Sequence, residues 1–218
     1  MFLPFTEAPR TDTQRAFAST LFGYQGASKS PLIEGRAEVT VFGPIAVRVG
    51  LLREQHSGRL RPSAGARVQV LSQRDDQPFD WSVGLFYKPE GFTEAEGEIE
   101  GVLAFARRFD RLGLFVDLVY GQDPEARERD GEVRCAGLYA LTSQLQLGID
   151  SRLRFDLGTE SEQFEEEGAV EYDLVLGPVI SYGFGNMAVG ALAGLSVLGT
   201  EPAAAIGPVF LGSLSGAL

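Results

Sequence analysis

The stretch that decides the fold is Gln144–Leu157, QLQLGIDSRLRFDL. Its odd-numbered positions are apolar except for Ser151, and its even-numbered positions are polar or charged except for Gly148. Successive side chains of a β-strand point to opposite faces, so this alternation predicts a strand with one apolar and one polar face. An ordinary globular strand has about 5–6 residues, and this pattern lasts more than twice as long. The strand therefore needs an apolar medium along one side and water along the other.

Similar alternation recurs along the chain and predicts about twelve strands. The expected segments are 14–24, 32–42, 45–53, 63–72, 80–88, 98–109, 111–121, 131–141, 144–157, 171–183, 187–198 and 204–216. The first is the weakest, because Thr11–Phe22 could instead form a short helix capped by Thr11 or Asp12.

The connections between these segments alternate in length. Tight turns are expected at Gly43-Pro44, Asp110, Thr142-Ser143 and Phe184–Asn186, whereas the intervening connections are longer and polar. Only 73–79 breaks the rule. In an up-and-down meander, alternate connections lie at opposite ends of the sheet. Short turns at one end and long loops at the other are typical of transmembrane barrels.

The apolar face is expected to point outward. About eight strands already make a barrel just narrow enough for side chains to fill, so twelve enclose more room than apolar side chains can pack. The opposite, lumen-facing set is mixed in sign, with ten acidic and seven basic residues by parity. The residues expected to line the lumen are Arg36, Glu38, Arg48, Arg67, Glu100, Asp117, Arg134, Asp150, Arg152, Arg154, Asp156 and Asp173. By parity Glu34, Glu98, Arg108, Glu132 and Glu171 belong with them.

Aromatic residues on the apolar face cluster near the two ends of the expected strands. Such rings settle at membrane–water interfaces and form girdles around transmembrane barrels. Only Phe42 has the wrong parity for the outer face. The expected interface aromatics are Tyr24, Trp81, Tyr87, Phe109, Tyr120, Tyr139, Phe155, Tyr172 and Tyr182.

One alternative is a transmembrane helix, because residues 174–199 carry no charge and include a GxxxG pattern at 190–194. Pro178 and the turn-forming stretch Tyr182–Asn186 divide this run into halves that are too short for spanning helices. Each half is long enough for a spanning strand, so we expect two strands here.

These patterns resemble bacterial outer-membrane β-barrel proteins over about residues 14–218. The resemblance implies a closed antiparallel up-and-down transmembrane β-barrel in the outer membrane, preceded by a periplasmic segment at residues 1–13. The start MFLPFTEAPR has no signal peptide, so we expect one to have been removed. The last strand of this class commonly ends in an aromatic residue, whereas this chain ends in Leu218.

Composition and motifs argue against several other functions. A net charge of −11 disfavours nucleic acid as a partner, and the single Cys135 excludes a cluster of zinc-binding thiolates. His56 next to Ser57 is interpreted as a loop histidine rather than part of a catalytic pair. The acidic run around Glu160–Glu167 is interpreted as a solvated loop rather than a calcium site. We therefore expect no catalytic residue, metal or cofactor.

The expected function is a passive or weakly cation-selective pore for small hydrophilic solutes or ions, with outer-membrane lipid as its other partner. Arg152 and Arg154, flanked by Asp150 and Asp156, form either an ion-pair ladder or part of the pore lining. The alternatives are a non-conducting structural or surface-interaction barrel, an outer-membrane hydrolase and a soluble lipocalin-like β protein.

Overall fold

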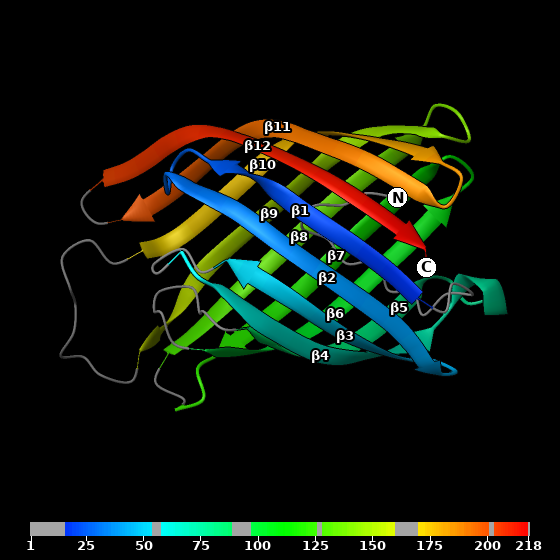
Figure 1. Ribbon diagram of the computed structural model, residues 1–218, viewed down its shortest axis with the longest axis horizontal. Coiled ribbons are helices and arrows are strands. Elements are labelled where there is room, and N and C mark those ends of the chain that lie inside the picture. Colours follow the sequence, from blue (N-terminus) through cyan, green and yellow to red (C-terminus); the bar gives the residue numbers. More distant parts are fainter. Residues whose placement is uncertain are drawn as a thin grey trace.

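A computed structural model describes residues 16–53, 58–88, 97–125, 128–159, 170–200 and 203–217. These residues form a closed barrel in which each strand pairs antiparallel with the next, and the last strand pairs with the first (Figure 1). The strands are β1 (Ala16–Gln25), β2 (Ser30–Phe42), β3 (Ile45–Arg53), β4 (Leu60–Leu71), β5 (Asp80–Lys88), β6 (Glu98–Phe109), β7 (Leu112–Gln122), β8 (Glu128–Ala140), β9 (Leu145–Thr159), β10 (Val170–Phe184), β11 (Met187–Thr200) and β12 (Ala203–Ala217). The predicted twelve-stranded up-and-down barrel is confirmed.

Every predicted strand boundary lies within three residues of the observed one. The part of Thr11–Phe22 that the structure describes belongs to strand β1, not to a helix. The predicted periplasmic segment 1–13 lies outside the described residues. Strands β10 and β11 occupy the uncharged run that could have formed a spanning helix. No helix in the described part of the chain is long and apolar enough to cross a membrane.

The two ends of the barrel differ in their connections. The short-turn end carries the connections 43–44, 110–111, 141–144 and 185–186. Gly43 (φ 49°) and Gly185 (φ 59°) adopt the left-handed conformation that such tight turns require. The other end, called here the long-loop end, carries the longer connections 54–59, 89–97, 123–127 and 160–169. It also has two brief connections, 26–29 and 201–202.

The predicted exception at 73–79 is explained by a short 3-10 helix, η1 (Gln73–Asp75). Its Gln73 side chain accepts a hydrogen bond from the Arg108 backbone N–H (2.8 Å). The Gln73 backbone N–H donates to Asp80 Oδ1 (2.8 Å). The segment therefore ties the start of β5 to the end of β6, which a tight turn would not do.

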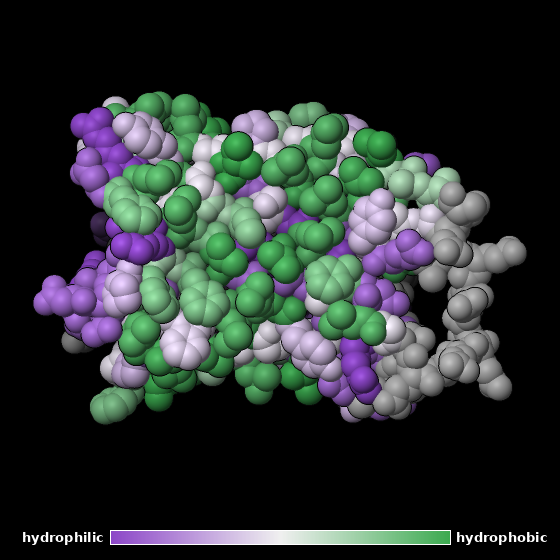
Figure 2. All heavy atoms as spheres, turned by 180° about the vertical axis from the view of Figure 1, so that it is seen from behind, coloured by the Kyte–Doolittle hydropathy of each residue, from purple (hydrophilic) through white to green (hydrophobic). Residues whose placement is uncertain are grey.

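The outer face of the barrel is apolar. Leu85, Ile149 and Leu195 are each about 60% exposed, and they lie near the middle of their strands. Figure 2 shows hydrophobic side chains across the middle of one face and hydrophilic ones concentrated toward its ends. In a water-soluble protein this apolar surface would be buried.

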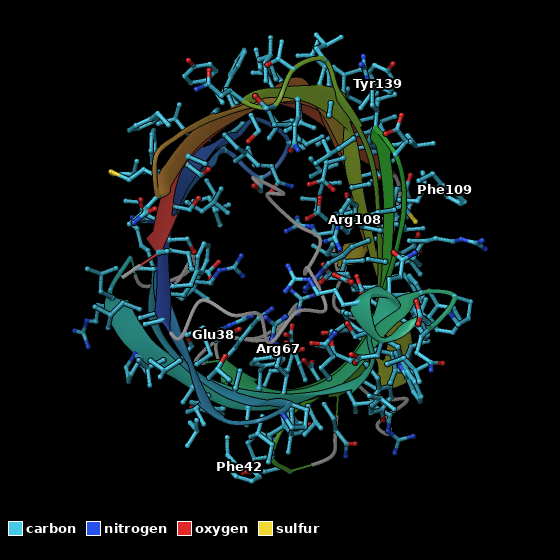
Figure 3. The ribbon with its side chains drawn as sticks, turned by 90° about the vertical axis from the view of Figure 1, so that its right-hand side faces the viewer. Glu38, Phe42, Arg67, Arg108, Phe109 and Tyr139 are labelled. Carbon is cyan, nitrogen blue, oxygen red and sulfur yellow. The ribbon has the colours of Figure 1, made fainter. Side chains whose placement is uncertain are left out.

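The inner face carries the charged residues. In the end-on view of Figure 3, Glu38, Arg67 and Arg108 point into the barrel, whereas Phe109 and Tyr139 point away from it. Asp117 and Asp150 are completely buried on the inner face, and Arg67 and Arg134 are each 8% exposed. The barrel thus holds its buried charges inside and exposes an apolar surface outside, which is the reverse of a soluble fold.

A bulge explains the parity of Phe42. The register of β2 with β3 shifts between Thr40 and Phe42. The extra residue lets two successive side chains, Val41 (65% exposed) and Phe42 (76% exposed), both point outward. Phe42 therefore belongs to the outer face after all, near the short-turn end.

Candidate functional site: the charged inner wall

Eleven of the twelve predicted lumen-lining residues lie in two groups on the inner face. Arg36, Glu38, Arg48 and Arg67 lie on β2–β4, whereas Glu100, Asp117, Arg134, Asp150, Arg152, Arg154 and Asp173 lie on β6–β10. Asp156 stands apart. It is exposed near the long-loop end of β9, where it accepts a hydrogen bond from the Gly158 backbone N–H (2.8 Å). Whether any of these residues lines a conducting path stays a prediction.

On β2–β4 one carboxylate bridges two arginines. Glu38 pairs with Arg48 (2.8 Å) and with Arg67 (2.5 Å), so it joins three neighbouring strands. The Arg48 guanidinium also lies over the ring of Phe86, 4.7 Å from its centroid. This inner aromatic ring is 8% exposed. The Arg48 guanidinium thus packs on an aromatic ring of the inner face, a cation–π arrangement that holds its side chain in place.

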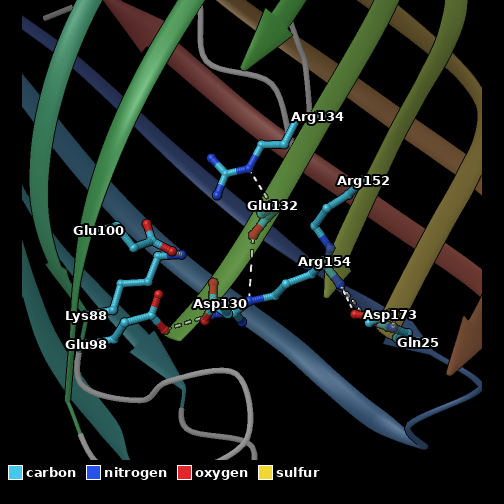
Figure 4. A network of polar contacts seen from close by, with 10 residues as sticks. All are labelled: Gln25, Lys88, Glu98, Glu100, Asp130, Glu132, Arg134, Arg152, Arg154 and Asp173. Carbon is cyan, nitrogen blue, oxygen red and sulfur yellow. Dashed lines mark hydrogen bonds and ion pairs between the residues drawn. The ribbon is translucent and has the colours of Figure 1, made fainter. Parts of the chain in front are cut away.

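A larger network covers the wall from β5 to β9 (Figure 4). Arg154 contacts three carboxylates: Glu98 (2.7 Å), Asp130 (3.0 Å) and, at a longer distance, Glu132 (3.8 Å). Glu132 is paired with Arg134 on its own strand. Lys88 of β5 pairs with Glu100 of β6 and completes the network on that side.

Gly121 gives the network the room it needs. A Cβ at this position would lie 1.9 Å from Glu98 Oε1 and 2.8 Å from Asp130 Oδ1. The two carboxylates therefore extend over β7, where a larger side chain would displace them. This close approach is how Glu98 on β6 reaches Arg154 on β9, three strands away.

The network continues across the seam where the barrel closes. Arg152 pairs with Asp173, and Gln25 at the end of β1 donates a hydrogen bond to Asp173 Oδ1 (2.6 Å). Arg152 also donates to Gln25 Oε1 (3.4 Å). These contacts join β9 and β10 to β1, passing over β11 and β12.

The β1–β2 turn packs beside this contact, against the inner wall. The Ala27 N–H donates to Ser196 Oγ (3.0 Å), and the Gly26 N–H donates to the Pro208 carbonyl (2.7 Å). A Cβ on Gly207 would lie 2.4 Å from the Gly26 carbonyl carbon. The turn therefore sits against β11 and β12, and it lies well short of the end of β11 and the start of β12 (Figure 1).

A third charged group lies at the short-turn end. Arg108 pairs with Asp80 (2.8 Å), and its guanidinium lies 5.5 Å from the centroid of the Phe115 ring. Both charged side chains point inward, close to η1.

Part of the inner wall is apolar, which the expectation of a polar lumen did not include. This inner apolar wall is one packed cluster of Ala106, Phe115, Ala136, Leu138, Val175, Val179, Leu192, Val209 and Leu211, with Leu21 and Leu32 against it. The inward side chains of β11 and β12 are uncharged, whereas β6, β7 and β8 carry both charged and apolar inward residues.

Sequence reasoning missed four members of the networks: Gln25, Asp80, Lys88 and Asp130. Asp80 and Lys88 have inner parity on β5 and could have been found by extending the parity rule to strand ends. Asp130 has the same parity as Glu132 and Arg134, but it lies one residue before the predicted start of this strand at 131. Nothing local marks Gln25, because its partners are more than 120 residues away.

The nine predicted interface aromatics all have outward parity in the strands. Tyr24, Tyr87, Tyr120 and Tyr139 are 43–47% exposed, and Trp81 stacks on Phe105 with centroids 6.0 Å apart. Contact with a membrane interface stays a prediction for all nine.

The structure describes only part of the remaining candidates. His56 and the Glu160–Glu167 run lie outside the described residues, so the structure does not test their interpretation as a loop histidine and a solvated acidic loop. Within the described ranges, no three His, Cys, Asp or Glu side chains are arranged to hold a metal ion. Cys135 is exposed on the outer face of β8.

Solved structures share this architecture. The fold is similar to that of the NanC porin, with a TM-score of 0.62 and 10% sequence identity, covering 92% of this chain and all of that one. It is also similar to the outer membrane channel DcaP of Acinetobacter baumannii, with a TM-score of 0.50 and 12% identity, covering 93% of this chain and 71% of that one. No protein-family model and no curated protein sequence matches the chain. At such low identity these likenesses establish a shared fold: this chain has the closed barrel architecture found in a porin and an outer-membrane channel.

Proposed function

We propose that this protein is an outer-membrane pore that passes small hydrophilic solutes, with a weak preference for cations. The observation that carries the proposal is the distribution of polarity across the wall. Closing the sheet leaves no strand edge unpaired around the ring, as a hydrocarbon environment demands. An apolar exterior suits lipid, and charged side chains on the inner face suit a wet lumen.

The likeness to a porin and to an outer-membrane channel supports a transport role and gives no support to an enzymatic one. We therefore propose lipid and small solutes or ions as partners, and no catalytic role. The location in a bacterial outer membrane is part of the same proposal.

Single-channel recording tests conduction directly. The protein would be refolded in detergent and added to a planar lipid bilayer in salt solution. A pore gives discrete, repeated current steps. Recovery of folded protein from the bilayers would verify that it had been incorporated. Bilayers that contain the protein but show no current steps would contradict the proposal.

A non-conducting barrel is the second candidate, and the ion pairing inside the barrel favours it. Glu98, Glu100 and Glu132 have side chains only 2–3% exposed, and each is paired with a cation. Paired side chains that narrow the lumen would leave a structural barrel whose loops meet a partner. Swelling of sugar-loaded vesicles separates the two, because only an open lumen admits the solute.

A further inference from the structure

One charged side chain lies on the outer face, where apolar residues otherwise prevail. We consider the described strand residues and leave out the first two and last two residues of each strand. Among those that remain, Arg107 is the one charged residue whose parity points it outward. It is exposed on β6, between the outward residues Phe105 and Phe109. Across the strand pair it faces Leu114 of β7, which also points outward.

Arg107 also differs from the inner arginines in its partners. Its guanidinium lies 4.7 Å from the centroid of the Phe109 ring, and no carboxylate of the described residues pairs with it. The adjacent Arg108, by contrast, points inward and pairs with Asp80 at 2.8 Å. The described residues thus supply counter-ions to the inner arginines and none to this outer cation.

The surroundings of Arg107 are those expected of a residue at headgroup depth. It lies two residues from the end of β6, at the short-turn end. Beside it, Trp81 stacks parallel on Phe105, and Phe79 lies 6.1 Å from Phe105. Aromatic rings of this kind settle at the membrane–water interface. An arginine on the lipid face is costly at the bilayer midplane and nearly free near the interface, where the phosphates lie.

We propose that Arg107 binds the phosphate of an anionic phospholipid in the leaflet at the short-turn end. A guanidinium over an aromatic ring keeps its in-plane N–H donors available, and their fork matches two phosphate oxygens. Phe109 holds the guanidinium, and Phe105 and Trp81 supply an apolar surface for the start of the acyl chains. This proposal rests on the membrane setting of the proposed function and does not depend on conduction.

Lipid titration followed by native mass spectrometry tests it on the full chain in detergent. We expect Arg107→Gln to weaken binding of the first phosphatidylglycerol about tenfold, as expected for the loss of one charge-assisted contact. Phe109→Leu should weaken it less. Lys29→Gln is the matched control, because Lys29 is an exposed cation in the β1–β2 turn, at the opposite end of the barrel. It should bind like the wild type.

Three outcomes would overturn the proposal. These are unchanged lipid affinity in Arg107→Gln, an equal loss in Lys29→Gln, or displacement of the lipid by millimolar inorganic phosphate. All variants must first be shown to fold, as a band on an unheated gel that migrates faster than the boiled protein. A wild-type protein that stays monomeric and soluble without detergent would instead refute the membrane setting, a separate and recognisable failure.

Discussion

At the scale of single residues, Arg154 is the centre of the inner network. Its guanidinium contacts Glu98, Asp130 and Glu132, and its side chain is 14% exposed. Glu98 Oε1 and Asp130 Oδ1 are buried without a hydrogen-bond partner among the described residues. These two carboxylates therefore depend on Arg154 for most of their electrostatic stabilisation.

Arg154→Gln should lower the free energy of unfolding by about 3 kcal/mol, because it leaves buried carboxylates without their cation. Urea titration of the protein folded in lipid vesicles, followed by Trp81 fluorescence, measures the change. Adding Glu98→Gln and Asp130→Asn to this variant should recover most of the loss, since the uncompensated charge is then gone. A triple variant as unstable as the single one would show that packing, not charge, explains the effect.

Individual residues also show where prediction from sequence stops. The inward position of Arg152 follows from alternation alone, and the structure bears out that parity. The contacts of Arg152 with Gln25 could not be predicted from alternation, because they depend on how far each strand is staggered around the closed barrel. The bulge between Thr40 and Phe42 shows in the sequence only as the wrong parity of Phe42, and parity alone cannot tell an inserted residue from an inward-pointing ring.

At the scale of elements, the strands themselves were largely predictable because period-2 alternation is strong when one face is charged. The inner apolar wall was not. Residues 174–199 are uncharged on both faces, so alternation there cannot tell Val175 and Leu192, which point inward, from their outward neighbours. The β1–β2 turn is a second such case, because nothing in its sequence shows that it packs inside the barrel.

Gly207→Ala should dislodge this turn. The new methyl group would lie within 3 Å of the backbone of Gly26 and Ala27, which cannot move without breaking the Ala27–Ser196 hydrogen bond. We expect a loss of about 1–3 kcal/mol, as for other overpacked sites. The temperature at which the folded band converts to the unfolded one on gels should fall.

Gly35→Ala provides the control, because no atom lies within 4 Å of its added Cβ. Both substitutions place an alanine in a strand, so intrinsic propensity cancels in the comparison. Equal melting temperatures for the two variants would mean that the turn contributes nothing to stability.

At the scale of the whole molecule, the exposed apolar belt predicts how the protein behaves in solution. We expect extraction from membranes only with detergent. On unheated gels the folded barrel should migrate faster than the boiled protein, because a closed sheet stays compact in the detergent. A single mobility before and after boiling would argue against a stable closed barrel.

The charge balance of the lumen predicts weak selectivity. The inward residues carry more carboxylates than cations, so cations should concentrate in the lumen at low salt. The Debye length falls from about 10 Å at 0.1 M to about 3 Å at 1 M, so the preference should nearly vanish at molar salt. Reversal potentials across a salt gradient measure it.

Neutralising Arg152 and Arg154 together should strengthen the cation preference, provided the double variant still gives the folded band. Neutralising Arg107, which lies on the outer face of β6, should leave it unchanged. Clear anion preference in the wild type, or no change in the double variant, would mean that this pair does not border an open path.

Because β1 pairs with β12, the twelve strands form a closed ring, and the chain ends fall at one of the connections between neighbouring strands. Phe17 lies opposite Ala217, so the first and last strands meet side by side at the short-turn end. A ring has no intrinsic beginning. A circular permutant that joins residues 217 and 16 through a short linker, and opens between Gly185 and Asn186, keeps every strand pair and both new ends on the original side. Such a permutant should assemble into the same barrel, whereas a chain lacking β12 would leave two unpaired edges.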